Sequence, residues 1–212
     1  HIMQDNHPNP LDAFRQVNVE MTKSLVQAAA QSGVSCFIYA SSVKVHDADA
    51  RETALDTTEN LNPKDPYGRS KWEAENYLKD FCDEHQMQCA LVRLPLVFGP
   101  GVKGNLLRLL KIVDRGIPMP LGAIHNERSM ISLPNLASFF DACLVHEDPT
   151  GTWMIEEEKP FSTTRLMQLM AQGMGRKPRL LPVPVFLLKT LGMATGKQDE
   201  IQRLTGSLKV NM

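Results

Sequence analysis

Two short apolar runs, separated by a longer polar and helical stretch, most constrain the fold of this 212-residue chain. Residues 34–40 (VSCFIYA) and 88–94 (QCALVRL) combine β-branched, aromatic and other apolar side chains, which is typical of strands buried on both faces of a parallel sheet. Between them the sequence predicts a polar loop over residues 43–65 and a helix from Pro66 to about His85. A strand, a helix and a second strand in this order form a right-handed crossover, so we expect an α/β fold with a parallel sheet.

The residues on either side of this unit predict further helices and strands. From Leu11 the apolar residues recur at helical spacing, and Gly33 is placed to end that helix. After Pro95 short strands and helices alternate, which predicts a smaller α+β lobe. We expect helices over 105–115, 135–146, 164–174, 185–195 and 198–204, and short strands over 117–121, 128–132 and 151–156. The chain is thus expected to divide into residues 1–98 and 99–212, with some segments of the second part returning to the main sheet.

The composition argues against several classes of function. The net charge is −1, so a general nucleic-acid or membrane-surface role has no electrostatic support. No apolar run approaches the roughly 18 to 20 residues of a membrane span, and His1-Ile2-Met3 has neither the basic nor the apolar part of a signal peptide. The cysteines lie singly in apolar segments without CxxC spacing, so we expect reduced thiols, no metal site and a cytoplasmic protein.

Tyr67 and Lys71 are the first candidates for chemistry. They stand four residues apart on the predicted helix and therefore share a face. Ser41 and Ser42 follow the first predicted strand, and the carboxyl ends of such strands face the ligand crevice in open α/β sheets. A tyrosine that exchanges a proton, a lysine that favours its phenolate and a serine that holds the substrate oxygen would together move a proton. A YxxxK pair also arises by chance on solvated helices, but the neighbouring serines favour the functional interpretation.

Four segments together resemble the extended short-chain dehydrogenase/reductase family. They are Asn18-Val19, residues 37–45 (FIYASSVKV), residues 66–71 (PYGRSK) and residues 93–101 (RLPLVFGPG). Residues 128–137 (RSMISLPNLA) are similar to the R-x-x-I-x-V-x-D-L-A segment of the same family. Within the family, the resemblance is to the nucleotide-sugar epimerases, dehydratases and 4-ketoreductases. It implies a Rossmann-like doubly wound parallel sheet with a smaller substrate lobe.

The resemblance also implies roles for the candidate residues. Tyr67 would be the acid/base at the sugar 4-hydroxyl, Lys71 would hold the nicotinamide ribose, and Ser42 would bind the same sugar oxygen. Asn18 would be a structural or relay residue, with an exposed helix asparagine as the alternative. The implied cofactor-binding residues are Ala40, Ser41, Tyr67, Lys71 and Pro95, and the implied substrate-binding residues are Ser42, Lys44, Asn105 and Arg128.

Two of these substrate assignments have plainer alternatives. Arg128 would clamp the substrate diphosphate, a task that suits a planar bidentate donor, but it could be a surface arginine. Asn105 would meet the nucleotide or a phosphate from the start of its helix, but it could be only a capping residue.

The chain departs from the family pattern after the serines. The family usually has V-Y-G where this chain has Val45-His46-Asp47. Dehydratases carry an Asp-Glu pair where Val43 and Lys44 stand, so we expect an epimerase or 4-ketoreductase of surface-polysaccharide synthesis and no dehydratase. His46 could be a site residue, but we interpret it as a loop histidine.

A larger departure is the absence of a glycine-rich loop of the type G-x-x-G-x-x-G before Leu11. Residues 99–104 do not replace it, because a proline interrupts them and they follow the wrong strand. We therefore expect that the first three or four strands of the fold, about 70 to 100 residues, are not in this chain. A sheet without them would expose an apolar edge that favours self-association.

The sequence thus predicts an NAD- or NADP-dependent nucleotide-sugar 4-epimerase of the UDP-glucose 4-epimerase type, acting on a UDP-linked sugar. A 4-ketoreductase of the same group is an alternative. A non-catalytic fragment or binding scaffold is a further alternative, because the cofactor loop is absent. The resemblance implies a homodimer, in which the first helix and the Tyr67 helix form a four-helix bundle with their mates.

Overall fold

The structure is a computed structural model and describes residues 8–211. The expectation for His1-Ile2-Met3 lies outside these residues. The main sheet has the strand order β1-β2-β5, with both pairs parallel. The strands are β1 (Cys36–Ser42), β2 (Gln88–Leu94) and β5 (Gly151–Met154).

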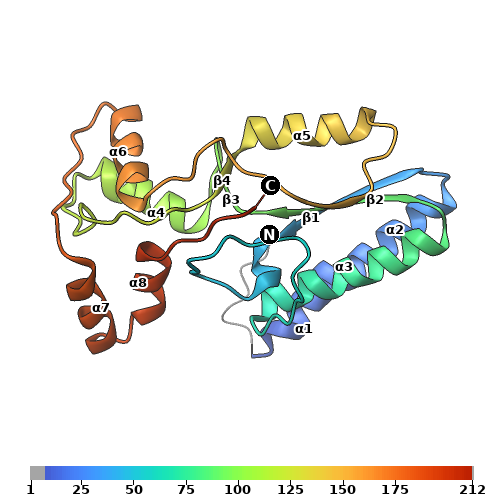
Figure 1. Ribbon diagram of the computed structural model, residues 1–212, viewed down its shortest axis with the longest axis horizontal. Coiled ribbons are helices and arrows are strands. Elements are labelled where there is room, and N and C mark those ends of the chain that lie inside the picture. Colours follow the sequence, from blue (N-terminus) through green and yellow to red (C-terminus); the bar gives the residue numbers. More distant parts are fainter. Residues whose placement is uncertain (1–7, 212) are drawn as a thin grey trace.

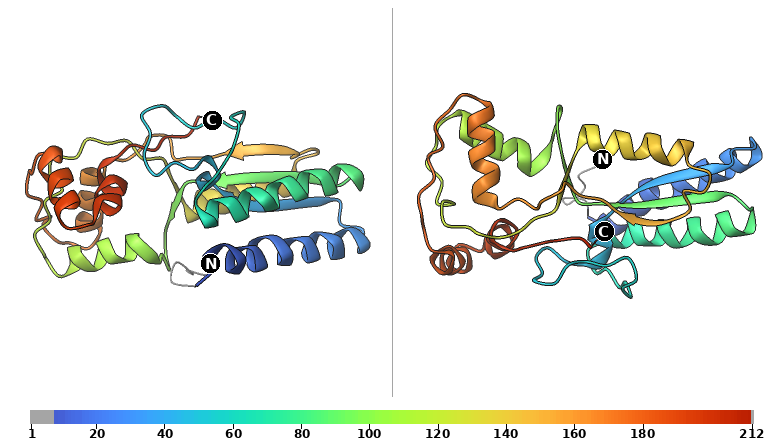
Figure 2. Two further views of the ribbon diagram at one scale, coloured as in Figure 1. Left: turned by 90° about the horizontal axis from the view of Figure 1, so that it is seen from below. Right: turned by 45° about the horizontal axis from the view of Figure 1, so that its top comes forward.

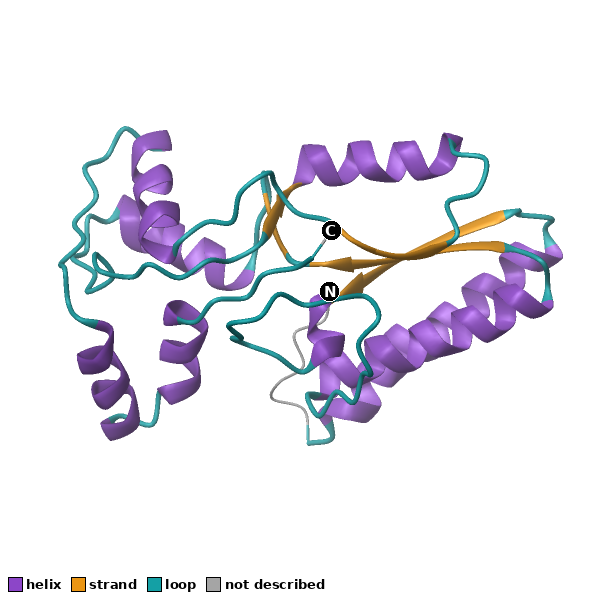
Figure 3. Cartoon of the chain, in the orientation of Figure 1, coloured by secondary structure: helices purple, strands orange, loops and turns teal. Residues whose placement is uncertain are grey.

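Helices cover both faces of this sheet. One face is covered by α1 (Pro10–Arg15), the π turn η1 (Gln16–Glu20), α2 (Met21–Gln31) and α3 (Pro66–Glu84), and the other by α5 (Leu133–Val145) (Figures 1 and 3). The doubly wound, Rossmann-like arrangement is therefore confirmed.

The core between the sheet and α2 and α3 explains why these elements stay together. Val26 and Leu78 face Tyr39 and Leu91 in one buried cluster. Burying each such side chain contributes about 1.5–3 kcal/mol. The apolar residues of these helices and of the strands therefore pack in the same core.

The second lobe contains a small parallel pair and a group of helices. The pair is β3 (Leu96–Phe98) and β4 (Met130–Ser132), and the helices are α4 (Gly104–Asp114), α6 (Thr163–Gly173), α7 (Val185–Ala194) and α8 (Gln198–Thr205). A separate core that includes Ile124, Met167 and Leu188 holds the helices together. Figure 2 shows this lobe at one end of the molecule, beyond the carboxyl ends of the main strands.

Several expectations for individual elements were wrong. The first strand starts at Cys36, two residues later than expected, and is not buried on both faces. Ala40 is exposed, because among the described residues only β2 pairs with this strand. Residues 117–121 form no strand beyond one bridge from Met119 to Leu180, since Pro118 and Pro120 lack the N–H groups that a ladder needs.

Other elements were not foreseen. The expected polar loop begins with a 3-10 helix, η2 (Val43–His46), and a short strand that was not expected, β3, follows β2. The first helix is continuous, but the π turn η1 interrupts its regular hydrogen bonding.

A long segment joins the two parts of the molecule. Residues 47–60, which we call the strap, leave η2 and run beside the end of the chain (Figure 2). The Leu55 N–H donates to the Lys209 carbonyl at 2.7 Å, and the Asn211 N–H donates back to the Leu55 carbonyl at 2.8 Å. The strap therefore ties the end of β1 to residues 209–211.

The four cysteines are free thiols, and burial raises the pKa of Cys82 and of Cys89. Within residues 8–211, every helix falls short of the length and apolar character needed to cross a bilayer.

Candidate active site

The candidate site forms where the end of β1 meets the start of α3. The Asp65 side chain accepts a hydrogen bond from the Gly68 N–H at 2.7 Å, and Pro66 occupies the first turn, so the helix starts just before Tyr67. The carbonyl of Lys44, in η2, lies directly against Gly68. A Cβ at Gly68 would overlap that carbonyl oxygen and lie 3.0 Å from its carbon. Glycine therefore allows η2, and with it Ser42, to approach the tyrosine.

Tyr67 lies against Ser42, as the resemblance implies. The Ser42 side chain hydrogen bonds to the Tyr67 phenol, which lowers the pKa of Tyr67, whereas burial raises that pKa more strongly. The Phe14 ring meets the Tyr67 ring edge-on, with 5.5 Å between centroids. The phenol is thus half-buried, and this burial favours its protonated form.

Lys71 lies one turn further along α3 and reaches the same strand end. Its ammonium donates to the Ala40 carbonyl at 2.9 Å and lies 4.6 Å from the centroid of the Tyr39 ring. Burial lowers the pKa of Lys71 from 10.5 to about 8, against an opposing effect of Glu75. The lysine is therefore partly desolvated, with a cost that an additional oxygen ligand would reduce.

Asn18 supports this arrangement from the π turn. Its Nδ2 donates to Ser70 Oγ at 2.9 Å, and Ser70 Oγ donates to the Tyr67 carbonyl at 2.8 Å. Asn18 is therefore not an exposed helix asparagine. π turns recur at functional sites, and this one directs a side chain to the first turn of α3.

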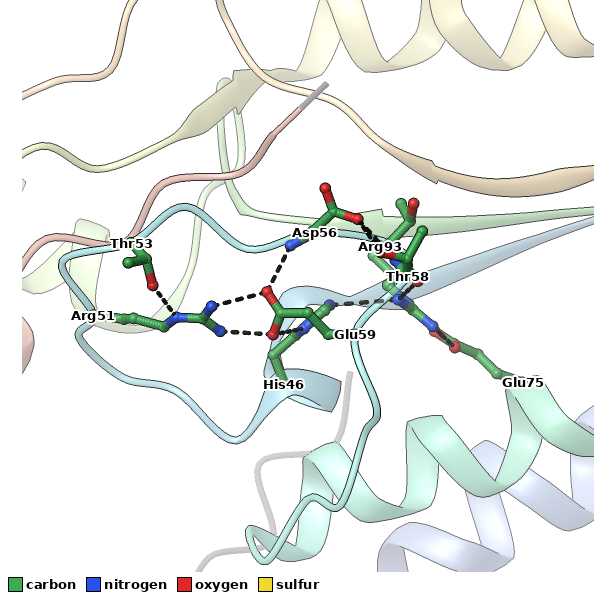
Figure 4. A network of polar contacts seen from close by, with 9 residues as sticks. His46, Arg51, Thr53, Asp56, Thr58, Glu59, Glu75 and Arg93 are labelled. Atoms are coloured by element: carbon green, nitrogen blue, oxygen red, sulfur yellow. Dashed lines mark hydrogen bonds and ion pairs between the residues drawn. The ribbon is translucent and has the colours of Figure 1, made fainter.

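A buried polar network lies behind the serines (Figure 4). Ser41 Oγ donates to Glu75, which forms an ion pair with Arg93 at 2.8 Å. Arg93 also lies 3.4 Å from His46 Nε2. On the far side of His46, Glu59 is paired with Arg51 at 2.6 Å. The network therefore runs from the end of β1 into the strap.

Sequence reasoning missed this network, although one signal was available. Arg93 stands inside the apolar run of β2, and a buried arginine requires a buried partner. Glu75 follows Lys71 by four residues on the same helix face, which places it under the strand.

The interpretation of His46 as a loop histidine was wrong. It ends the 3-10 helix η2, and its side chain is completely buried. Its Nδ1 lies 3.5 Å from Glu59 and has no hydrogen-bond partner among the described residues. Burial and the nearby Arg93 lower the pKa of His46, so the ring is neutral near pH 7.

Lys44 and Arg128 both contact Asp49, Lys44 at the side-chain carboxylate and Arg128 at the main-chain carbonyl. The Lys44 ammonium forms an ion pair with the Asp49 carboxylate, and Arg203 donates to the same carboxylate at 3.2 Å. Arg128 Nη1 donates to the carbonyls of Arg203 and Gly206, at 2.9 and 3.1 Å, and to that of Asp49 at 3.4 Å. Arg128 is therefore not an ordinary surface arginine, and burial lowers its pKa.

The two remaining candidates, Pro95 and Asn105, lie outside the group of Ser42, Tyr67 and Lys71. Pro95 is buried between β2 and β3, at the end of the strand next to β1. Asn105 is exposed in the first turn of α4. Among the described residues, no group of three or more His, Cys, Asp and Glu side chains could hold a metal ion.

Known proteins that are similar in sequence to this chain include 4-epimerases. The chain is 35% identical over 215 aligned residues to a UDP-glucose 4-epimerase from Vibrio cholerae, covering 100% of this chain and 66% of the relative. It is 31% identical to the N-acetyl-alpha-D-glucosaminyl-diphospho-ditrans,octacis-undecaprenol 4-epimerase of Escherichia coli O157:H7, covering 93% of this chain and 59% of the relative.

Among solved structures, the Bordetella bronchiseptica enzyme WbmG in complex with NAD and UDP has the same fold. The TM-score is 0.71 at 18% identity, covering 97% of this chain and 61% of WbmG. The chain thus spans about three fifths to two thirds of the length of these proteins. The sequence model of the NAD dependent epimerase/dehydratase family matches residues 3–153, which is more than half of the chain. The chain therefore belongs to the NAD-dependent epimerase/dehydratase family, within the extended short-chain dehydrogenases/reductases.

Proposed function

We propose that this chain is the catalytic and substrate-binding part of an NAD(P)-dependent nucleotide-sugar 4-epimerase. The observation that carries the proposal is the half-buried Tyr67 phenol, hydrogen bonded to Ser42 and one helical turn from Lys71. Family membership and the similarity to the 4-epimerases of Vibrio cholerae and Escherichia coli O157:H7 support it.

In this proposal Tyr67 takes the proton of the sugar 4-hydroxyl as that group becomes a ketone. It returns the proton when the hydroxyl forms again on the opposite face of the sugar. Ser42 holds the same oxygen, because its hydroxyl already lies against the phenol. The Lys71 charge favours the phenolate that Tyr67 must become.

The residues at the end of β1 fit a nicotinamide nucleotide. The Lys71 ammonium can donate three hydrogen bonds, and the Ala40 carbonyl is the acceptor that the structure gives it. A ribose hydroxyl would supply a further acceptor, and Ala40, Ser41 and Pro95 would line the same edge. When bound, the nucleotide would accept a hydride from sugar C4 and return it. NAD is the choice we favour, because the similar WbmG structure holds NAD.

For the substrate we propose a sugar that is linked to a second group through a diphosphate. The first candidate is a UDP-sugar, in which the second group is uridine. Lys44, Arg128 and Arg203 gather positive charge around Asp49, and Arg128 and Asn105 remain our candidates for the diphosphate and the nucleotide. A lipid-linked diphosphate sugar is a second candidate, because the Escherichia coli relative is a 4-epimerase of such a compound.

We further propose a cytoplasmic homodimer that pairs α2 and α3 with their mates. Met21 and Leu25 on α2 are exposed apolar residues, which agrees with a helix face that needs a partner.

Tyr67→Phe tests the proposal directly. We expect turnover of UDP-glucose to UDP-galactose, or of the lipid-linked sugar, to fall about 10²- to 10⁴-fold, the usual contribution of a positioned acid/base. Substrate affinity should change little. Tyr77→Phe is the matched control, because Tyr77 lies on the same helix and its hydroxyl accepts a hydrogen bond from Gln27 at 3.0 Å, away from Ser42 and Lys71. Unchanged turnover in Tyr67→Phe would refute the assignment.

The cofactor is measured separately, by denaturing the purified protein, assaying released NAD(H) and titrating NADH fluorescence. Nucleotide binding with turnover of a 4-keto sugar alone would indicate the reductase alternative. No binding and no turnover in the full encoded chain would favour a scaffold.

A further inference from the structure

The last three residues of β1, 40–42, are each held by one face of α3. That face consists of three residues spaced four apart along the helix: Tyr67, Lys71 and Glu75. The Tyr67 phenol is hydrogen bonded to Ser42, and the Lys71 ammonium donates to the carbonyl of residue 40 at 2.9 Å. Between these two contacts, the Ser41 hydroxyl donates to the Glu75 carboxylate. The group of residues at the strand end therefore extends one helical turn further than the candidate site, to Glu75.

Glu75 is the residue of this face to which the proposed reaction gives no part. Its side chain is completely buried, and its other partner is Arg93 on β2, at 2.8 Å (Figure 4). A buried ion pair is weak evidence for stability, because the cost of taking both charges out of water can exceed their attraction. Well-packed apolar residues would hold the helix on the sheet equally well. The buried charge of Glu75 therefore points to a use other than packing.

That use lies at Lys71, whose ammonium is partly removed from water. Burial lowers the pKa of Lys71 to about 8, and the Glu75 carboxylate, one turn along the helix, opposes this effect. The other titratable groups on this side are Tyr39 on β1, Tyr67 on α3 and, behind Glu75, Arg93 on β2. Burial raises the pKa of both tyrosines, so they are neutral near pH 7, and the arginine is positive. The negative charge beside Lys71 thus comes from Glu75.

We propose that Glu75 is a positioning residue for the proton transfer, which holds Ser41 at the strand end and keeps Lys71 charged beside Tyr67. This role rests on the proposed 4-epimerase function, because a reaction that forms the Tyr67 phenolate needs the lysine charge. Without the Glu75 charge, the Lys71 ammonium would lose its proton at a lower pH, and a neutral lysine no longer stabilises the phenolate. Glu75 acts through Lys71 and touches neither the sugar nor the nucleotide.

The first test follows Lys71 itself and needs no turnover. The full encoded chain is labelled with acetic anhydride over a series of pH values, and peptide mass spectrometry gives the midpoint at which the Lys71 amine becomes neutral and reactive. We expect a midpoint near pH 8 for the unchanged chain. In Glu75→Gln the midpoint should be lower by at least about one pH unit. Glu75→Asp keeps the charge and should restore most of this difference.

Glu73→Gln is the matched control for the labelling experiment. It is the same substitution on the same helix, at a residue that pairs with Arg15 at 2.6 Å. We expect it to leave the Lys71 midpoint where it is in the unchanged chain. A shift in this control as large as that in Glu75→Gln would overturn the proposal, because the effect would then belong to any lost acid on α3.

A second variant covers the case in which Glu75→Gln fails to fold, since that change leaves Arg93 buried without a counter-charge. Glu75→Gln/Arg93→Met removes both charges, and circular dichroism reports whether it folds. If the pair were only structural, this variant would keep the Lys71 midpoint of the unchanged chain. We expect the lowered midpoint to remain. An unchanged midpoint in either folded variant would overturn the proposal and leave Glu75 as the counter-ion of Arg93.

Turnover gives a separate readout. In Glu75→Gln the alkaline limb of the kcat profile should move to lower pH by about the same amount as the Lys71 midpoint, with little change in KM for the sugar. A midpoint that shifts while the alkaline limb stays in place would overturn the link to proton transfer. The epimerase assignment fails through a different variant, Tyr67→Phe with unchanged turnover, so the two failures can be told apart.

Discussion

At the residue scale, the site is built from groups that are costly to bury and are therefore paired. Glu75 and Arg93 are both buried, and each supplies the other's counter-charge while Glu75 also accepts from Ser41. Breaking such a pair by removing one partner typically costs about 3–5 kcal/mol. The pair therefore fixes the end of β1, where Ser42 must meet Tyr67.

His46→Gln should make the protein less sensitive to acid. The pKa of His46 in the folded chain lies below its usual 6.5. Below pH 6.5 the unfolded chain therefore binds more protons than the folded chain at this position, and stability is lost as the pH falls from there. The groups that face the ring are Glu59, Arg93 and Glu75.

Chemical denaturation of both proteins over a series of pH values measures this effect. At pH 7 to 8 we expect His46→Gln to be less stable by about 0.5–1.5 kcal/mol, from the weakened contact with Arg93. Below pH 6.5 the difference should shrink, because glutamine does not titrate. Parallel pH profiles for the two proteins would contradict the prediction, because they would show that His46 binds its proton equally well in the folded and the unfolded chain.

At the scale of elements, the approach of η2 to α3 depends on one glycine. Replacing Gly68 by alanine would normally favour a helix by about 1 kcal/mol. Here the new Cβ would overlap the Lys44 carbonyl, which is backbone and cannot turn away. We therefore expect the cost of this overlap to exceed the gain in helix propensity.

We expect Gly68→Ala to destabilise the protein by about 1–3 kcal/mol and to lower turnover by moving Ser42 away from Tyr67. Gly173→Ala is the control, because Gly173 also lies in a helix and nothing lies within 4 Å of its added Cβ. Thermal unfolding and initial rates on both variants measure the difference. Equal behaviour of the two would mean that η2 does not press on α3.

The elements of the main sheet could be predicted from sequence because each has a strong local signal. Residues 88–94 form β2 as expected, and α3 starts at the Asp65-Pro66 signal. The proximity of Ser42, Tyr67 and Lys71 was also foreseen, from strand-end geometry and from the resemblance.

The rest depended on contacts that no local pattern contains. The η2 helix follows from the packing of the Lys44 carbonyl on Gly68, and the burial of His46 follows from Arg93 and Glu59, which are distant in sequence. Arg128 has three carbonyl partners that come from the strap and from α8 and its end. A residue's own neighbours in sequence carry no information about such partners.

At the scale of the whole molecule, Asp49 links the two lobes through the strap. Its carboxylate meets Lys44 next to the site and Arg203 on α8, and these partners hold the pKa of Asp49 below its usual range. The aspartate is half-buried, so these contacts are less screened than surface ion pairs.

Asp49→Asn should loosen the strap without unfolding the sheet. We expect a local loss of about 1–2 kcal/mol, seen as faster hydrogen exchange at the amides of Arg51, Leu55 and Asn211. Amides in β2 should keep their protection. Asp114→Asn is the control, because its partner Arg176 is an exposed surface contact. Unchanged hydrogen exchange at the Leu55 amide in Asp49→Asn would show that the backbone hydrogen bonds hold the strap without the side-chain contacts of Asp49.

The strap also sets an order for folding. The contacts that assemble the site join residues 31 apart for Lys71 and Ala40, and 52 apart for Asn18 and Ser70. The contacts of the strap join residues 154 and 155 apart, at Arg203 with Asp49 and Asn211 with Asp56. Contacts between distant residues form slowly, because the chain must first close a long loop. During synthesis Ser42, Tyr67 and Lys71 can therefore reach their positions while the strap is still without its partner, and the strap pairs with residues 203–211 later.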